Sequence, residues 1–162
     1  MLEPWWLLAG AGLVLALLVL IWRPVRAASR EARFAQARRD FHAQRERLEV
    51  KFIHLAAANA QSRALHWADC DFDDDVAYVR NRNTGELSAF VAVTVATDDF
   101  DDPSAGVGDL VGNLRAGTAV FRFDRDHWET DGRAILNLNP AEAIRYFQDD
   151  LEVVEQELAR QW

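Results

Sequence analysis

The chain has 162 residues, 50% of them hydrophobic, and a formal net charge of −8. Its single cysteine, Cys70, cannot form an internal disulfide, which fits a reducing compartment. The charge is divided unevenly: residues 52–162 hold 21 acidic and nine basic side chains, whereas residues 23–51 hold four acidic and nine basic ones. Because an acidic surface repels phosphate, we expect no nucleic-acid binding by the C-terminal part.

An apolar run of eighteen residues without any charge extends from Trp5 to Trp22. As a helix with a rise of about 1.5 Å per residue it spans about 27 Å, close to the bilayer's hydrocarbon thickness of about 30 Å. A cleaved signal peptide is the less favoured alternative, because no basic segment precedes the run. We predict a single transmembrane helix over residues 5–22, with Trp5, Trp6 and Trp22 at the two headgroup layers.

Basic residues follow the apolar run at once, beginning with Arg23 and Arg26. Because positive charge is retained on the cytoplasmic side, the protein is expected in the cell (inner) membrane with its C-terminal part in the cytoplasm. Each arginine near an anionic bilayer adds about 1 kcal/mol of attraction. The expected organisation is a transmembrane helix (5–22), a basic juxtamembrane helix (23–51) and an acidic α+β domain (52–162).

One long helix is predicted over residues 27–63, where good helix formers dominate and proline and glycine do not occur. An apolar residue recurs every seven positions along it, at Phe34, Phe41, Leu48 and Leu55. Such spacing can indicate a coiled coil through which the chain self-associates. The alternative is a helix that packs its C-terminal half on the domain, because polar residues occupy the partner positions of a coiled coil: Arg38, Gln44, Arg45 and Lys51.

Segments rich in aromatic and β-branched residues follow, which is typical of strands. They are residues 64–72, 76–82, 86–97, 115–124 and 127–137. The short turns Asn83-Thr84-Gly85 and Arg125-Asp126 require antiparallel neighbours, because a parallel crossover needs about a dozen residues. Residues 88–96 are nearly apolar on both faces and indicate a central, covered strand. The prediction is an antiparallel sheet of four to five strands.

A C-terminal helix is predicted from Asn139 to Gln161. Asn139 is the N-cap, Pro140 takes the first position, and Glu142 stands where a capping box requires it. An apolar stripe at helical spacing follows, made of Ile144, Phe147, Leu151, Val154 and Leu158.

The order of long helix, antiparallel strands and C-terminal helix resembles the cystatin or NTF2-like architecture, a likeness that implies no function. Four stretches also resemble small membrane-anchored proteins predicted from planctomycete bacterial genomes: Trp67–Phe72, Arg82–Leu87, Asp131–Arg133 and Asn139–Glu142. No activity is attached to that group. The resemblance therefore implies an anchored domain and no particular chemistry.

The densest acidic cluster consists of Asp69, Asp71, Asp73, Asp74 and Asp75. Carboxylates at this spacing begin like a calcium-binding loop. The pattern then fails, because Asp74 stands where the loop needs glycine and Arg80 where it needs a bidentate glutamate. We predict a charged strand edge and turn, with divalent-metal binding as the alternative.

Other candidate groups do not combine into a catalytic or binding set. Residues 98–112 contain acidic residues and glycines but lack the lysine of a phosphate loop, and we predict a mobile loop. His66 and Cys70 are about 13 Å apart along a strand, and acidic neighbours should raise the pKa of the thiol. Trp67 and Trp128 are expected in the core or at its rim.

The sequence therefore favours a membrane-anchored interaction or scaffold domain without catalytic, cofactor-binding or metal-binding residues. Its expected partners are the lipid bilayer and either another protein or a second copy, bound through the helix over residues 27–63. The alternatives are a small-molecule-binding or enzymatic pocket between the sheet and the C-terminal helix, and metal binding by the acidic cluster.

Overall fold

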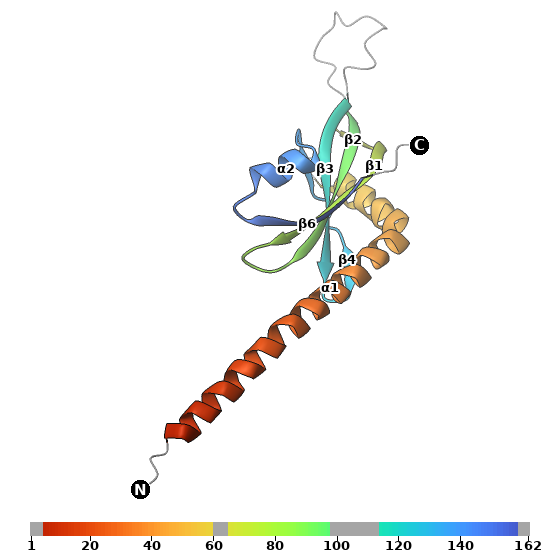
Figure 1. Cartoon of the computed structure of the whole chain (residues 1–162). Helices are drawn as coiled ribbons and strands as arrows, with labels where there is room; N and C mark the ends of the chain where they lie inside the picture. The colour runs from red at the N-terminus through yellow and green to blue at the C-terminus, as the bar shows by residue number, and fades with distance from the viewer. Residues whose placement is uncertain (1–4, 60–64, 98–113, 159–162) are drawn as a thin grey trace, which may run out of the picture. The chain divides into compact units, whose positions relative to one another are not determined.

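A computed structural model describes the backbone of residues 5–59, 65–97 and 114–158; among residues 5–27 it describes the side chain of Leu13 alone. The fold is α+β, as predicted, with a long helix and an antiparallel sheet (Figure 1). The elements in chain order are α1 (Trp5–Ala58), β1 (Leu65–Asn81), β2 (Leu87–Thr97), β3 (Leu114–Asp124), β4 (His127–Glu129), β5 (Ala134–Leu136), α2 (Pro140–Tyr146) and β6 (Leu151–Glu157).

The chain divides into two compact units, residues 1–40 and residues 41–162. The first unit contains the N-terminal part of α1. The predicted interface residues Trp5, Trp6, Trp22, Arg23 and Arg26 lie outside the described side chains, so their role stays a prediction. Across the described residues, the structure has no helix that is both long enough and apolar enough to cross a membrane.

The sheet has the strand order β4-β3-β2-β1-β6, with β5 also paired to β3, so the described residues contribute six strands where four to five were predicted. The central position of β2 is confirmed, since it pairs with β1 on one side and β3 on the other. Both predicted turns are present. Gly85 takes a φ of 75° in the first, and Arg125 takes a φ of 55° in the second.

The acidic cluster lies inside β1 and does not interrupt it. The two strands predicted over 64–72 and 76–82 are one strand of 17 residues, Leu65–Asn81. Its register with β2 shifts between His66 and Asp71 and again between Phe72 and Val76. Extra residues in one strand can bulge outward while pairing continues on either side, which is why charged residues here did not end the strand.

The strand predicted over 127–137 is broken into β4 and β5, and both pair with β3. Gly132 lies in the break, with a φ of 73°. Its backbone runs against the end of α1: a Cβ on Gly132 would lie 2.5 Å from the backbone nitrogen of Ala56. The close approach to the helix accounts for the interruption.

The prediction of a helix extending to Gln161 is wrong, because α2 ends at Tyr146. The cap itself is confirmed: the Glu142 backbone nitrogen donates to Asn139 Oδ1 at 2.9 Å, and the Asn139 nitrogen donates to Glu142 Oε2 at 2.9 Å. After a turn, residues 151–157 form β6 and pair with residues 76–81, the C-terminal part of β1. The apolar residues of this segment are spaced as in a helix, but hydrogen bonding to β1 stabilises the strand conformation instead.

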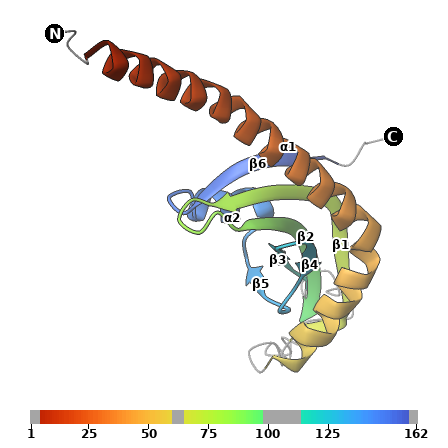
Figure 2. The same cartoon turned by 90° about the horizontal axis from the view of Figure 1, so that it is seen from below.

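The C-terminal part of α1 covers one face of the sheet (Figure 2). Phe41 is fully buried, and its ring centroid lies 5.9 Å from that of Tyr78, 5.5 Å from Phe121 and 4.9 Å from Trp128. Phe52, also fully buried, contacts Trp67, Phe72 and Phe121. From Phe41 onward, the seven-residue stripe is therefore buried within the same chain at Phe41 and Leu48 and half-buried at Leu55.

The opposite face of the sheet carries a second, smaller core. Ala143 of α2 is fully buried there and clusters with Ala77, Val79 and Phe90. Partly buried side chains complete the cluster, among them Ile144 and Leu151. The sheet thus separates the core under α1 from the core under α2.

Candidate functional site

The acidic cluster is held by an arginine of α1. Arg45 donates from Nη2 to the carbonyl oxygen of Asp73 and from Nη1 to that of Asp74, the latter at 3.2 Å. The side chain of Arg45 is only 16% exposed, and its Nε also donates to Glu49 at 2.7 Å. The bulged segment of β1 is thereby bound to α1 through the backbone carbonyl groups of Asp73 and Asp74.

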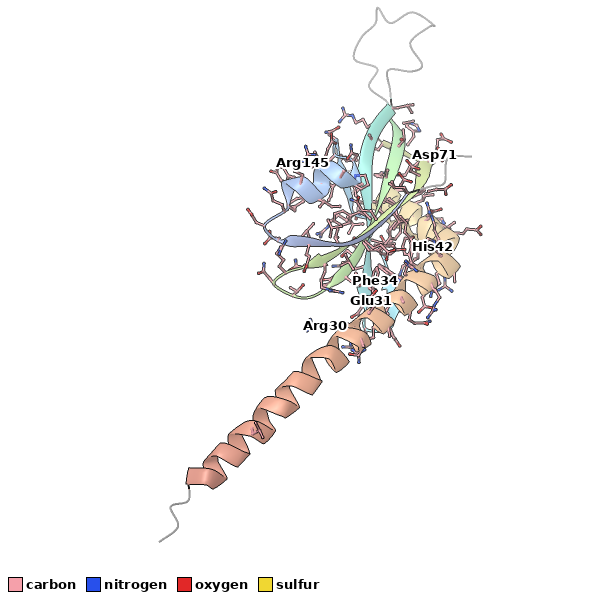
Figure 3. All side chains as sticks on the ribbon, viewed as in Figure 1. Arg30, Glu31, Phe34, His42, Asp71 and Arg145 are labelled. Atoms are coloured by element: carbon pink, nitrogen blue, oxygen red, sulfur yellow. The ribbon has the colours of Figure 1, made fainter. Side chains whose placement is uncertain are left out.

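The carboxylates of this cluster do not converge. Asp69, Asp71, Asp73 and Asp74 are exposed and Asp75 is half-buried (Figure 3 labels Asp71). In the part of the chain with described coordinates, no group of three or more potential ligands could hold a metal ion. Arg45 also lies 3.9 Å from Asp74 Oδ1, so a fixed positive charge already stands beside that carboxylate. These observations give the metal-binding alternative no support.

A polar cluster that the sequence did not predict joins α1, β1 and β6. His42 Nε2 lies 2.6 Å from Glu157 Oε2, and Tyr78 Oη lies 3.4 Å from each of these atoms (Figure 3 labels His42). Tyr78 is fully buried, whereas the side chains of His42 and Glu157 are 47% and 26% exposed. No local pattern links residues so far apart, and the prediction that Glu157 is helical hid the contact.

The arrangement of His42, Tyr78 and Glu157 can share a proton between the imidazole and the carboxylate, because the two groups are within hydrogen-bond distance. It also ties β6 to α1. A nucleophilic cysteine does not join it, since the chain's single cysteine, Cys70, lies elsewhere on β1. We therefore describe the cluster as a contact that joins α1, β1 and β6.

A shallow hollow of about 310 Å³ lies between the sheet and the beginning of α2. Its lining includes apolar residues of β1 and β2, namely Val76, Ala77 and Ala92, and the carboxylate residues Asp73, Asp75 and Glu157. Neither Trp67 nor Trp128 belongs to it, because each is 3% exposed and packs in the core under α1. The prediction that both tryptophans lie in the core or at its rim is confirmed, and both lie in the core.

Two further titratable groups are Cys70 of β1 and His127 of β4. Cys70 is half-buried, and burial raises the pKa of its thiol, with smaller contributions from Glu49, Asp71 and Asp69. The sequence analysis also predicted a raised pKa for the Cys70 thiol, but it attributed the shift to acidic neighbours, whereas burial makes the largest contribution. His127 Nδ1 lies 3.0 Å from Asp126 Oδ1, and this hydrogen bond lowers the pKa of Asp126. The predicted loop over residues 98–112 lies outside the described residues.

Large apolar side chains are exposed at the end of α2 and in β6. Tyr146 is 73% exposed, Phe147 37% and Val153 45%. The rings of Tyr146 and Phe147 contact each other edge to face, with centroids 4.9 Å apart. Phe147 and Leu158 were predicted in the apolar stripe of a longer C-terminal helix, and both are exposed because α2 ends at Tyr146.

No protein-family model, no curated protein and no solved structure matches this chain.

Proposed function

We propose that the protein is a single-pass membrane protein whose acidic α+β domain serves as a cytoplasmic interaction or scaffold module. The membrane part of the proposal is supported by the uncharged run over residues 5–22 and the nine basic residues that follow it over residues 23–51. The finer assignment to a cystatin or NTF2-like architecture belongs to the same proposal. It is supported by a helix that precedes and covers an antiparallel sheet.

The observation that carries the interaction role is the exposed pair of contacting rings, Tyr146 and Phe147. Contiguous exposed apolar side chains with polar surroundings are typical of binding surfaces. The sheet face beneath α1 is filled by Phe41 and Phe52, so it offers no room for a ligand. A domain with one filled face and apolar side chains on its surface is suited to binding another macromolecule.

The membrane anchor is tested by fractionation of cells that express the full chain with a C-terminal tag. We expect the tag in the membrane pellet after a carbonate wash, and protected from protease added outside intact cells. A Val14→Arg variant should move the chain to the soluble fraction, because a central arginine costs insertion about 2.5–3.5 kcal/mol. Val50→Arg is the matched control, since Val50 is 54% exposed and outside the apolar run. Wild-type protein in the soluble extract would refute the anchor.

A second candidate function is favoured by the hollow of about 310 Å³ beside α2. Apolar walls with the carboxylate residues Asp73 and Asp75 suit a small organic amine, whose ammonium group the acids would attract. Thermal unfolding with butylamine, compared with butanol, tests this function. A shift with the amine alone that Ala92→Leu abolishes would support it, and equal shifts with both compounds would exclude it.

A further inference from the structure

The segment that joins α2 to β6 is exposed, and its backbone is held by hydrogen bonds. Each residue from 145 to 150 is exposed, and the last four form a turn. The Phe147 carbonyl oxygen accepts from the backbone nitrogens of Asp150 at 3.0 Å and Leu151 at 2.9 Å. The Arg82 backbone nitrogen donates to the Asp150 carbonyl oxygen at 2.8 Å, which binds this turn to the one between β1 and β2. Binding a partner here therefore costs little conformational entropy.

Tyr146 and Phe147 form the apolar part of this segment. Their ring centroids are 4.9 Å apart, and the two residues are 73% and 37% exposed. Arg145 precedes the rings on α2, where Figure 3 labels it, and Asp149 follows them in the turn. Across the described residues, no ion pair or hydrogen bond engages the side chain of Arg145 or Asp149. One cation and one carboxylate therefore flank the rings, and both are available to a partner.

The order of these side chains is self-complementary. Phe147 is the middle residue of Arg145–Asp149, which begins with the cation and ends with the carboxylate. When two such segments face each other in opposite directions, the cation of each lies opposite the carboxylate of the other. Two-fold symmetry produces this arrangement, because every contact across the axis occurs twice.

We propose that the segment Arg145–Asp149 pairs with the same segment of a second copy of this chain across a two-fold axis at Phe147. Two ion pairs then form between Arg145 and Asp149 of different copies, and the aromatic rings between them bury each other's apolar surface. The inference deepens the proposed interaction function by naming its partner, and it rests on that function.

Charge complementarity selects a second copy over other occupants. A partner segment with charges of one sign would be repelled at one end, because Arg145 and Asp149 carry opposite charges. The surface also differs from the seven-residue stripe of α1, whose Phe41 and Leu48 are buried within the chain. Self-association through the segment therefore leaves the core of the domain intact.

The size of the surface sets the strength of the dimer. Aromatic side chains bury about 150–250 Å² each, so four rings bury at most about 1,000 Å². A stable protein interface buries about 1,200–2,000 Å². We therefore expect a reversible dimer whose population rises with protein concentration.

Energy transfer between full-length copies in detergent tests the pairing, with a donor or an acceptor fluorescent protein fused to the C-terminus. We expect transfer that rises with protein concentration for the wild type. Arg145→Glu and Asp149→Arg should each lower the association constant about tenfold, because an exposed ion pair is worth about two- to fivefold and is lost twice. A mixture of the two variants, one as donor and one as acceptor, should regain wild-type transfer, since every contact then joins opposite charges.

Two variants elsewhere are matched controls. Lys51→Glu on α1 and Asp124→Arg at the end of β3 make the same changes of charge at exposed positions, and both should associate like the wild type. Absence of concentration-dependent transfer for the wild type would refute the pairing. Wild-type association by both charge variants, or no recovery in their mixture, would refute it as well.

Phe147→Ser separates this inference from the proposed function. It should weaken association at least as much as the charge variants, because it removes an aromatic ring from the centre of the interface. If it weakens association while both charge variants do not, the rings bind in another arrangement, and the two-fold pairing fails although the interaction function stands. Fractionation reports the membrane anchor separately, since association in detergent does not require the anchor.

Discussion

Replacing Gly132 by alanine should destabilise the domain strongly, for two reasons that the structure separates. Gly132 has a φ of 73°, a conformation that costs a residue with a Cβ about 1–2 kcal/mol. The new Cβ would also lie 2.5 Å from the nitrogen of Ala56 and 2.7 Å from the carbonyl carbon of Leu55. Both are backbone atoms of α1, so the helix end must move, and overpacking of this kind costs about 1–3 kcal/mol more.

Gly85→Ala is the matched control for this substitution. Gly85 has nearly the same φ, 75°, but a Cβ there would meet no described atom within 4 Å. Urea unfolding of the full chain in detergent, followed by the fluorescence of the buried tryptophans, measures both variants. We expect Gly132→Ala to lose about 1–3 kcal/mol more than Gly85→Ala. Equal losses would refute the close contact between Gly132 and α1.

Three further predictions concern α1 and β1. Phe41→Ala should cost about 3–5 kcal/mol because Phe41 is fully buried, whereas Val50→Ala should stay within about 0.5 kcal/mol in the same urea assay; similar losses would contradict the packing of α1 on the sheet. Arg45→Ala should cost about 1–3 kcal/mol through its lost bonds to the bulge of β1, while the exposed Arg47, which donates to Gln44, should tolerate alanine. Cys70 should react with iodoacetamide at a higher midpoint pH in the folded chain than in urea, because burial in the fold raises the pKa of its thiol above the ordinary value; a lower midpoint when folded would disprove the buried setting.

Local signals in the sequence predicted several features correctly. The side chain of Asn139 caps α2, and Gly85 adopts the positive φ that its turn needs, because both depend on atoms only a few residues away. Residues 88–96 were predicted as a central strand because they are nearly apolar on both faces. A strand that is covered on both faces needs apolar side chains on each of them, and β2 does occupy a central position in the sheet.

Features that depend on distant partners could not be read from the sequence. Residues 151–157 carry apolar side chains at a spacing that suits a helix, yet they form β6 because the outer edge of β1 was available for pairing. The bulges of β1 likewise allow one strand to continue through five aspartates, and Arg45, far away in sequence, binds the backbone carbonyl groups of Asp73 and Asp74.

The features of the candidate site also divide into those that the sequence determines and those that depend on the tertiary structure. The sequence by itself determined the charge distribution, the apolar N-terminal run and the elements with local caps and turns. Only the tertiary structure decided that His42 meets Glu157 and that β6 pairs with β1 where a helix was predicted, which leaves Tyr146 and Phe147 exposed at the end of α2. The reason is physical: caps and turns are satisfied within a few residues, whereas strand register is set by pairing between segments far apart in the chain.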